Sequence, residues 1–110
     1  MIKRRIYSVA DKITWLTHEF TVHLHGEQWN NVAGIYIFAG LNRLNQWTPL
    51  YIGQAGSFQD RIPSHEQWDK ARSLGATHVH AKVVQLQPQR DSIEKQLIQA
   101  FQPRLNTQLK

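Results

Sequence analysis

The alternation of apolar and polar residues along the chain predicts a small β-sheet. Residues 32–39 (VAGIYIFA) form an almost continuous apolar run, and residues 49–53 (PLYIG) form a second run after the polar loop 40–48. Residues 77–84 alternate strictly, which is typical of a strand. We expect its apolar positions to face inward and its polar positions outward, that is Val79, Ala81 and Val83 against His78, His80 and Lys82.

The remaining pattern adds one strand and two helical regions. Residues 20–25 also alternate, and we expect them to form an N-terminal edge strand. Residues 57–74 are helical in composition but interrupted by Pro63, so a second helix is predicted to start at Ser64. Residues 88–102 predict a longer helix bounded by prolines. This order predicts an α+β domain whose sheet is small and mainly antiparallel, with three core strands and the edge strand flanked by helices.

Two tripeptides within the apolar runs mirror each other. Gly34-Ile35-Tyr36 is followed, after residues 37–50, by Tyr51-Ile52-Gly53. If the runs pair antiparallel with the glycines opposed, Tyr36 opposes Tyr51 and both rings point to one face of the sheet. Glycine weakens a strand and often marks the close approach of a ligand. We therefore expect Gly34 and Gly53 to lie where a ligand contacts the backbone.

Composition favours a nucleic-acid partner. The 110 residues suffice for one domain, which we divide into an N-terminal extension (1–31) and a main unit (32–110). Thirteen Lys and Arg against eight Asp and Glu give a net charge of +5 and a pI near 9.9, which favours a polyanion. The absence of cysteine excludes disulfides and thiolate metal sites. No apolar run has the length of a signal peptide or a membrane span, so we expect a cytoplasmic protein that does not bind membranes.

A charged residue interrupts the apolar stripe of the last predicted helix. Glu94 lies three, four and seven residues before apolar positions of that stripe. A carboxylate in such a place is costly unless it is paired or binds a metal. Two interpretations follow, an ion pair with Lys or Arg at the rim of the stripe and a metal ligand. The stripe comprises Ile93, Leu97, Ile98, Ala100 and Phe101.

Three further polar residues are candidates for chemistry. Arg61 and His65 are four residues apart, one helical turn, and Arg is suited to bidentate contact with phosphate. Asn106 follows the last predicted helix. Taken singly, Arg61 and His65 are more simply explained as surface residues, and Asn106 as a loop residue.

Together these residues resemble the GIY-YIG nuclease family. The matching pieces span about residues 32–107: the two tripeptides, Arg61 with His65, Glu94 within IEKQLI, and Asn106 within QPRLN. Each piece is a weak signal, but their order and spacing make the combination specific. The resemblance implies the GIY-YIG endonuclease fold and metal-dependent hydrolysis of phosphodiester bonds, usually in DNA.

The resemblance also implies a role for each charged residue. Glu94 would hold one divalent ion that binds the scissile phosphate and stabilises the leaving oxygen, and Arg61 would neutralise the phosphate charge. A single carboxylate without a second acidic cluster favours one hard ion, Mg²⁺ or Mn²⁺.

For the remaining residues the resemblance implies proton transfer and support. Tyr36 would be the general base toward water, Tyr51 would orient water or phosphate, His65 would relay the proton from Tyr36, and Asn106 would support the site by hydrogen bonding. A free tyrosine has a pKa near 10, so ionising it at neutral pH costs roughly 4 kcal/mol. Tyr36 therefore needs a nearby cation or base.

Contacts to nucleic acid, with DNA favoured over RNA, are expected from further basic and aromatic residues. One site per chain cuts one strand at a time, so we expect nicking with weak sequence preference by a monomer or a weak homodimer. The expected contacts are Lys3, Arg4, Arg5 and Arg104 with the backbone and Trp47, in a loop, with bases.

Two alternatives to an active nuclease stay open. A non-catalytic nucleic-acid-binding module could keep the same fold. A zinc protein is the other, prompted by His23-x-His25 and His78-x-His80, because each pair lies on one face of a predicted strand.

Overall fold

The structure, a computed structural model, describes residues 11–107 and has the predicted α+β architecture. Its strands are β1 (Lys12–Trp15), β2 (His18–His23), β3 (Gly34–Leu41), β4 (Trp47–Ala55) and β5 (His78–Val83). Its helices are α1 (Phe58–Arg61), α2 (Trp68–Ser73), α3 (Gln87–Phe101) and α4 (Arg104–Thr107).

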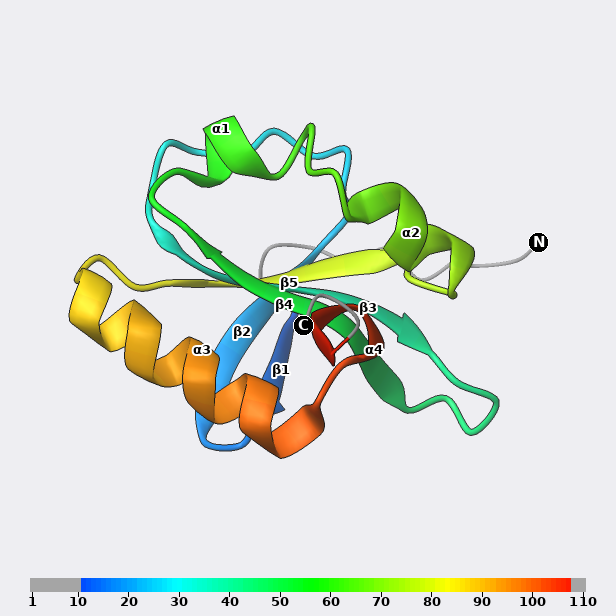
Figure 1. Ribbon diagram of the computed structural model, residues 1–110. Helices are drawn as coiled ribbons and strands as arrows, with labels where there is room; N and C mark the ends of the chain where they lie inside the picture. Colours follow the sequence, from blue (N-terminus) through cyan, green and yellow to red (C-terminus); the bar gives the residue numbers. More distant parts are fainter. Residues whose placement is uncertain (1–10, 108–110) are drawn as a thin grey trace.

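The strands form one antiparallel sheet in the order β1-β2-β5-β3-β4. Helices α1 and α2 lie over one face, and α3 lies over the other (Figure 1). We call these the α1–α2 face and the α3 face. A buried cluster fills each, with Tyr36 and Phe38 on the first and Ile35, Ile37 and Leu97 on the second. Burial on both faces explains why the central strand β3 reads as a continuous apolar run.

The register between β3 and β4 differs from the prediction by two residues. Tyr36 pairs with Gly53, and Phe38 pairs with Tyr51, whereas the mirrored tripeptides predicted Gly34 opposite Gly53 and Tyr36 opposite Tyr51. A slip of two residues leaves each side chain on its expected face, because successive side chains alternate. The tyrosines are therefore diagonal neighbours with ring centroids 6.3 Å apart. Within the structure itself, the pairing of β3 with β4 shifts register at a β-bulge just after Phe38.

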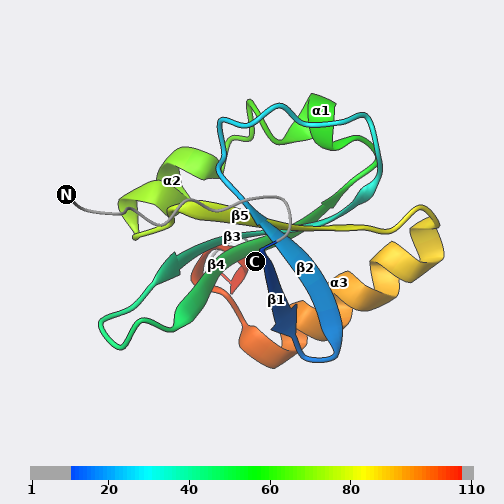
Figure 2. The same ribbon diagram turned by 180° about the vertical axis from the view of Figure 1, so that it is seen from behind.

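The N-terminal part of the sheet is larger than predicted. The expected edge strand exists as β2, but it lies between β1 and β5 and is an inner strand (Figure 2). Among the described residues the edge on that side is β1, which the sequence did not reveal because its four residues, KITW, are too few for a period. Within residues 11–107 the sheet therefore contains five strands, and it continues across the predicted boundary at residue 31.

Strand β5 contains a buried histidine that was expected to face outward. His80 has no exposed surface and accepts a hydrogen bond at Nδ1 from Trp15 Nε1, 2.9 Å away. Val79 and Ala81 are buried as predicted, but Val83 is 55 % exposed. Strict alternation does not separate inside from outside in this strand, because helices cover both faces of the sheet.

The helices agree with the sequence pattern except between residues 62 and 67. Ser57 caps α1 through a hydrogen bond that its Oγ accepts from Asp60 N at 3.2 Å. No helix restarts at Ser64, and turns lead instead to α2 at Trp68. Helix α3 matches its predicted bounds to within one residue, although Ala100 of the predicted stripe is exposed. None of the described helices has the length and apolar character that a membrane crossing requires.

Candidate active site

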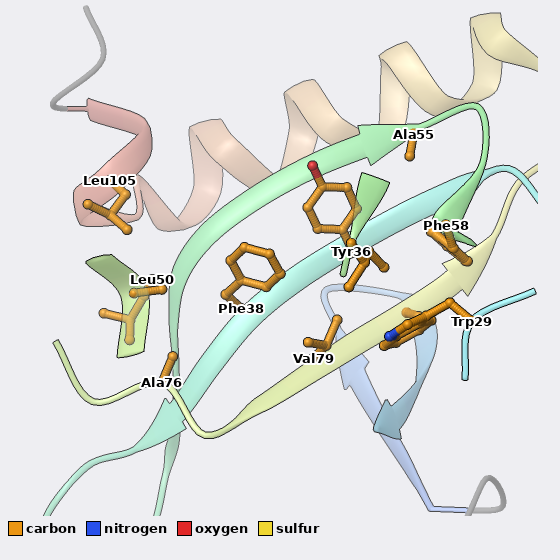
Figure 3. Close-up of a cluster of buried hydrophobic side chains, with 12 residues drawn as sticks. Trp29, Tyr36, Phe38, Leu50, Ala55, Phe58, Ala76, Val79 and Leu105 are labelled. Atoms are coloured by element: carbon orange, nitrogen blue, oxygen red, sulfur yellow. The ribbon is translucent and has the colours of Figure 1, made fainter. Parts of the chain in front are cut away.

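The side chain of Tyr36 fills a space that glycine leaves open on the neighbouring strand. Tyr36 is 1 % exposed on the α1–α2 face (Figure 3), opposite Gly53. A Cβ atom at Gly53 would lie 2.6 Å from Tyr36 Oη and 2.7 Å from its Cζ. At Gly34 a Cβ would meet the Lys82 carbonyl oxygen and lie 2.5 Å from Phe58 Cζ. Both glycines thus have packing roles, and ligand contact at either stays a prediction.

His65 is fixed between Tyr36 and the backbone. Its Nε2 lies 2.7 Å from Tyr36 Oη, and its Nδ1 accepts a hydrogen bond from Gln67 N at 3.0 Å. Burial, then Arg61 and His25, lower the pKa of His65 to about 4, so the ring is neutral at pH 7. Because Nδ1 is an acceptor, the single ring hydrogen is on Nε2 and points at Tyr36 Oη. In this tautomer His65 donates to Tyr36, and a relay of the Tyr36 proton through His65 stays a prediction.

Tyr36 is held as a neutral phenol by its surroundings. Its pKa is raised well above the usual value, first by burial and then by the charges of Tyr51, Glu94 and Glu66, while Arg61 lowers it. The pKa of Tyr51 is also raised, mainly by burial. These influences place Tyr51 of β4, Arg61 of α1 and Glu94 of α3 within electrostatic reach of the Tyr36 phenol.

Arg61 makes a contact that the sequence did not predict. Its Nη1 and Nη2 donate to the two carboxylate oxygens of Glu66, each at 2.8 Å. The hydrogen bond to Glu66 raises the pKa of Arg61, and the same bond followed by the backbone of Glu66 lowers the pKa of that carboxyl to about 2. Both groups are charged at neutral pH, and the predicted phosphate clamp holds a carboxylate.

Glu94 lies at the edge of β4 in a polar group. Its Oε1 accepts a hydrogen bond from Gln54 Nε2 at 2.9 Å, and the same nitrogen donates to Asp91 Oδ1 at 2.8 Å. Gln54 Oε1 in turn accepts from Arg90 Nε at 3.2 Å. Among residues 11–107, Glu94 forms no ion pair, so the predicted rim salt bridge is not found there.

The residues around Glu94 fit a hard divalent cation. Within the described chain, Oε2 of Glu94 accepts no hydrogen bond, which leaves a carboxylate oxygen for a ligand, and Asp91 supplies further oxygens nearby. Mg²⁺ typically binds one or two carboxylates and keeps several waters. No group of three or more acidic, His or Cys residues that could hold a metal occurs in residues 11–107. This arrangement suits a cation shared with substrate oxygens and gives the zinc interpretation no ligand set.

Asn106 stabilises the open edge of β4. Its Oδ1 accepts from Ile52 N and its Nδ2 donates to Ile52 O, both at 2.8 Å. The side-chain amide thus pairs with the strand as a neighbouring peptide group would. It fixes the backbone between Tyr51 and Gly53, and a supporting role of Asn106 in catalysis stays a prediction.

The other residues predicted to contact nucleic acid lie away from this site or outside residues 11–107. Trp47 begins β4, not a loop, and packs edge-to-face with His80 at 4.6 Å on the α3 face, opposite to Tyr36. Arg104 is exposed at the start of α4. A role in binding nucleic acid stays a prediction for both. The basic cluster Lys3, Arg4 and Arg5 lies outside the described residues.

The histidine pairs and a nearby cavity do not join the site. His23 contacts Glu27 at 3.0 Å, and His25 stacks on Trp68 with ring centroids 4.2 Å apart. A cavity of about 320 Å³ between β2, β5 and residues 29–32 is lined by none of the predicted catalytic residues. The candidate catalytic residues therefore lie outside this cavity.

Three residues of the site escaped the sequence reading. Glu66 is five residues from Arg61, a spacing with no regular helical meaning, and the turn after Pro63 brings them together. Gln54 follows Gly53 directly, and its position after the tripeptide was the only available signal. Arg90 is 7 % exposed and donates to two backbone carbonyls, and nothing in the sequence distinguishes it from a surface arginine.

Solved structures of one kind resemble this chain. No protein-family model and no curated protein matches it. The GIY-YIG N-terminal endonuclease domain of UvrC from Thermotoga maritima, bound to its catalytic magnesium, matches with a TM-score of 0.56 and 23 % identity over 69 % of this chain and 84 % of that one. A tyrosine-to-phenylalanine mutant of the same domain matches with a TM-score of 0.54 and 25 % identity over 69 % and 83 %. By its fold, and with both tripeptides on adjacent strands, this chain is a domain of the GIY-YIG superfamily.

Proposed function

We propose that this protein is a metal-dependent nuclease that hydrolyses phosphodiester bonds in DNA. The observation that carries the proposal is the hydrogen bond between Tyr36 and His65, with the Arg61 cation and the Glu94 carboxylate close enough to shift the pKa of Tyr36. A fold alone does not specify an activity, but this set supplies a proton-transfer group, an anion clamp and a cation ligand at one place. The magnesium-bound UvrC domain of the same fold supports the reaction class.

Tyr36 and His65 would form the proton-transfer pair. A Tyr36 phenolate, the form that accepts a proton from water, would be stabilised by the Nε2–H that His65 donates across 2.7 Å. His65 is held in that tautomer by Gln67 N, and it would act by favouring the phenolate rather than by taking the proton. Tyr51, the diagonal neighbour of Tyr36, would orient water or phosphate.

Glu94 would bind the metal cation, and Arg61 would bind the phosphate anion of the substrate. Glu94 would hold the cation, with Gln54 orienting its carboxylate and Asp91 beside it. A bound Mg²⁺ or Mn²⁺ would polarise the scissile phosphate and add positive charge that lowers the pKa of Tyr36. Arg61 would neutralise the phosphate through its two terminal nitrogens, a geometry suited to phosphate oxygens.

The test is incubation of the protein with end-labelled single-stranded, duplex and branched DNA, with Mg²⁺, Mn²⁺ or EDTA. We expect cleavage only in the presence of a divalent ion. DNA binding without cleavage under every metal condition would favour the non-catalytic module instead. A non-catalytic module would not cleave DNA, so Tyr36 and Glu94 would have no catalytic role in it.

A single site of this kind would cut one strand at a time. We propose nicking with weak sequence preference. Sequence-specific protein–DNA interfaces bury roughly 1,000 Å² or more of protein surface, and in this small domain the site occupies much of one edge of the sheet. End-mapping of plasmid products, with sedimentation of the protein, would check this. A long recognition sequence cut on both strands by a monomer would contradict it.

A further inference from the structure

The pair formed by Arg61 and Glu66 occupies the position expected for an enzyme–phosphate contact. Arg61 donates through both terminal nitrogens to both oxygens of Glu66, at 2.8 Å each. Carboxylate and phosphate are the two anions that match this guanidinium fork. A carboxylate on Nη1 and Nη2 prevents that same pair of N–H groups from binding a phosphate.

The turn that carries Glu66 is anchored on both sides of this residue. The preceding His65 is 5 % exposed and bound to Tyr36 and to Gln67 N, and Gln67 itself is 7 % exposed. The side chain of Glu66, by contrast, is 64 % exposed, and that of Arg61 is 39 % exposed. The carboxylate can therefore rotate into solvent and release Arg61 while the backbone of the turn stays in place.

We propose that the Glu66 carboxylate occupies the substrate-phosphate position on Arg61 in the free protein, so that DNA binding exchanges one anion for the other. This inference rests on the proposed nuclease function. The exchange lowers the affinity of this position for anions in general, because an anion that takes the Nη1–Nη2 pair of Arg61 must displace Glu66. The cost arises before both the substrate complex and the transition state, so it alters KM and leaves kcat unchanged.

A matched control is available on α2. Asp69 pairs with Arg72 at 3.9 Å through a single contact, and both side chains are exposed. Glu66→Gln and Asp69→Asn remove the same charge from exposed acid–arginine pairs, and only Glu66→Gln frees Arg61. Comparing these two variants separates a local effect on Arg61 from the general effect of one extra positive charge.

The experiment is equilibrium binding of a fluorescein-labelled 20-base-pair duplex in EDTA. Glu66→Gln should bind roughly two- to fivefold more tightly than Asp69→Asn, the range expected for an exposed ion pair. Its log Kd should also depend more steeply on log salt, by about 0.9 for one additional phosphate contact. In an Arg61→Ala background the gain from Glu66→Gln should vanish. Thermal melting would confirm that each variant is folded.

Three outcomes would overturn the exchange: equal affinities for Glu66→Gln and Asp69→Asn, a gain that persists without Arg61, and no binding by Glu66→Gln at all. In Mg²⁺, a reduced kcat of Glu66→Gln would also overturn it, because Glu66 would then hold Arg61 in a productive position. Since binding is measured without metal, a protein that binds but never cleaves would refute the nuclease proposal alone, and the binding cycle would still decide the role of Glu66.

Discussion

Replacing Gly53 by alanine tests whether the position of Tyr36 depends on a missing side chain. The new Cβ would lie 2.6 Å from Tyr36 Oη, 2.7 Å from Tyr36 Cζ and 3.0 Å from Tyr51 Cε2. Ordinary contact begins near 3.4 Å, so the Tyr36 ring must retreat by about 0.8 Å or β4 must move. Tyr36 is buried, which leaves it little space for that movement.

The expected costs differ for stability and activity. Overpacking of this kind typically lowers the free energy of unfolding by about 1–3 kcal/mol. The same displacement would strain the 2.7 Å contact between Tyr36 Oη and His65 Nε2. A misplacement of about 1 Å can reduce the rate of a catalysed step by about 10²-fold. We therefore expect Gly53→Ala to lose cleavage far beyond the fraction of protein that it unfolds.

Urea unfolding and plasmid nicking by the same preparations would measure both effects. Gly56→Ala is the matched control, since it lies just past β4 and a Cβ there meets nothing within 4 Å. That variant should change stability by less than about 0.5 kcal/mol and keep its activity. If Gly53→Ala is as stable and active as Gly56→Ala, the packing of Tyr36 against β4 is refuted. If it is destabilised but fully active, the placement of Tyr36 does not control turnover.

Three further predictions concern other parts of the site and the core. Tyr36→Phe should lower the cleavage rate by about 10²- to 10⁴-fold, and by more than Tyr51→Phe does, while both variants still bind DNA. Equal losses in single-turnover rate would refute the assignment of proton transfer to Tyr36 alone. Asn106→Ala should lower the free energy of unfolding, measured in urea, by about 1–3 kcal/mol, because two hydrogen bonds of 2.8 Å to the β4 backbone are lost. Unchanged stability would show that these hydrogen bonds do not stabilise the fold. Burial, then neighbouring histidines, lower the pKa of His80 to about 3 from 6.5, so below pH 6.5 the unfolded chain binds a proton that the folded chain excludes. The stability from this group is present above pH 6.5 and lost toward pH 3, by about 5 kcal/mol at most. In thermal melts from pH 7 to 4, His80→Gln should show a shallower decline than the parent protein.

The sequence predicted the elements that local patterns define. Strands β3 and β4 and helix α3 follow from apolar runs and flanking prolines, and the tripeptides correctly brought Tyr36 and Tyr51 to one face. The register was wrong because the mirrored letters suggested that like residues oppose each other. In the fold, the large Tyr36 ring lies against the strand position that has no Cβ, and this packing requires Gly53 opposite Tyr36.

Features that depend on distant segments escaped the sequence. His80 alternates with apolar residues, but Trp15 of β1 and Trp47 of β4, both distant in the sequence, pack against it and bury it. The partners of Arg61 and Glu94 were hidden for a similar reason. Glu66 reaches Arg61 through an irregular turn, and Gln54 reaches Glu94 from another element.

The most direct test of a metal-dependent nuclease is nicking of a supercoiled plasmid in Mg²⁺ by the parent protein and by Glu94→Gln. Glu19→Gln removes the same charge from an exposed pair with Lys12 and serves as the control. Parent and control should nick the plasmid in Mg²⁺ and not in EDTA, while Glu94→Gln, with an unchanged melting temperature, should be inactive. Full nicking by Glu94→Gln, or nicking by the parent protein in EDTA, would contradict the account.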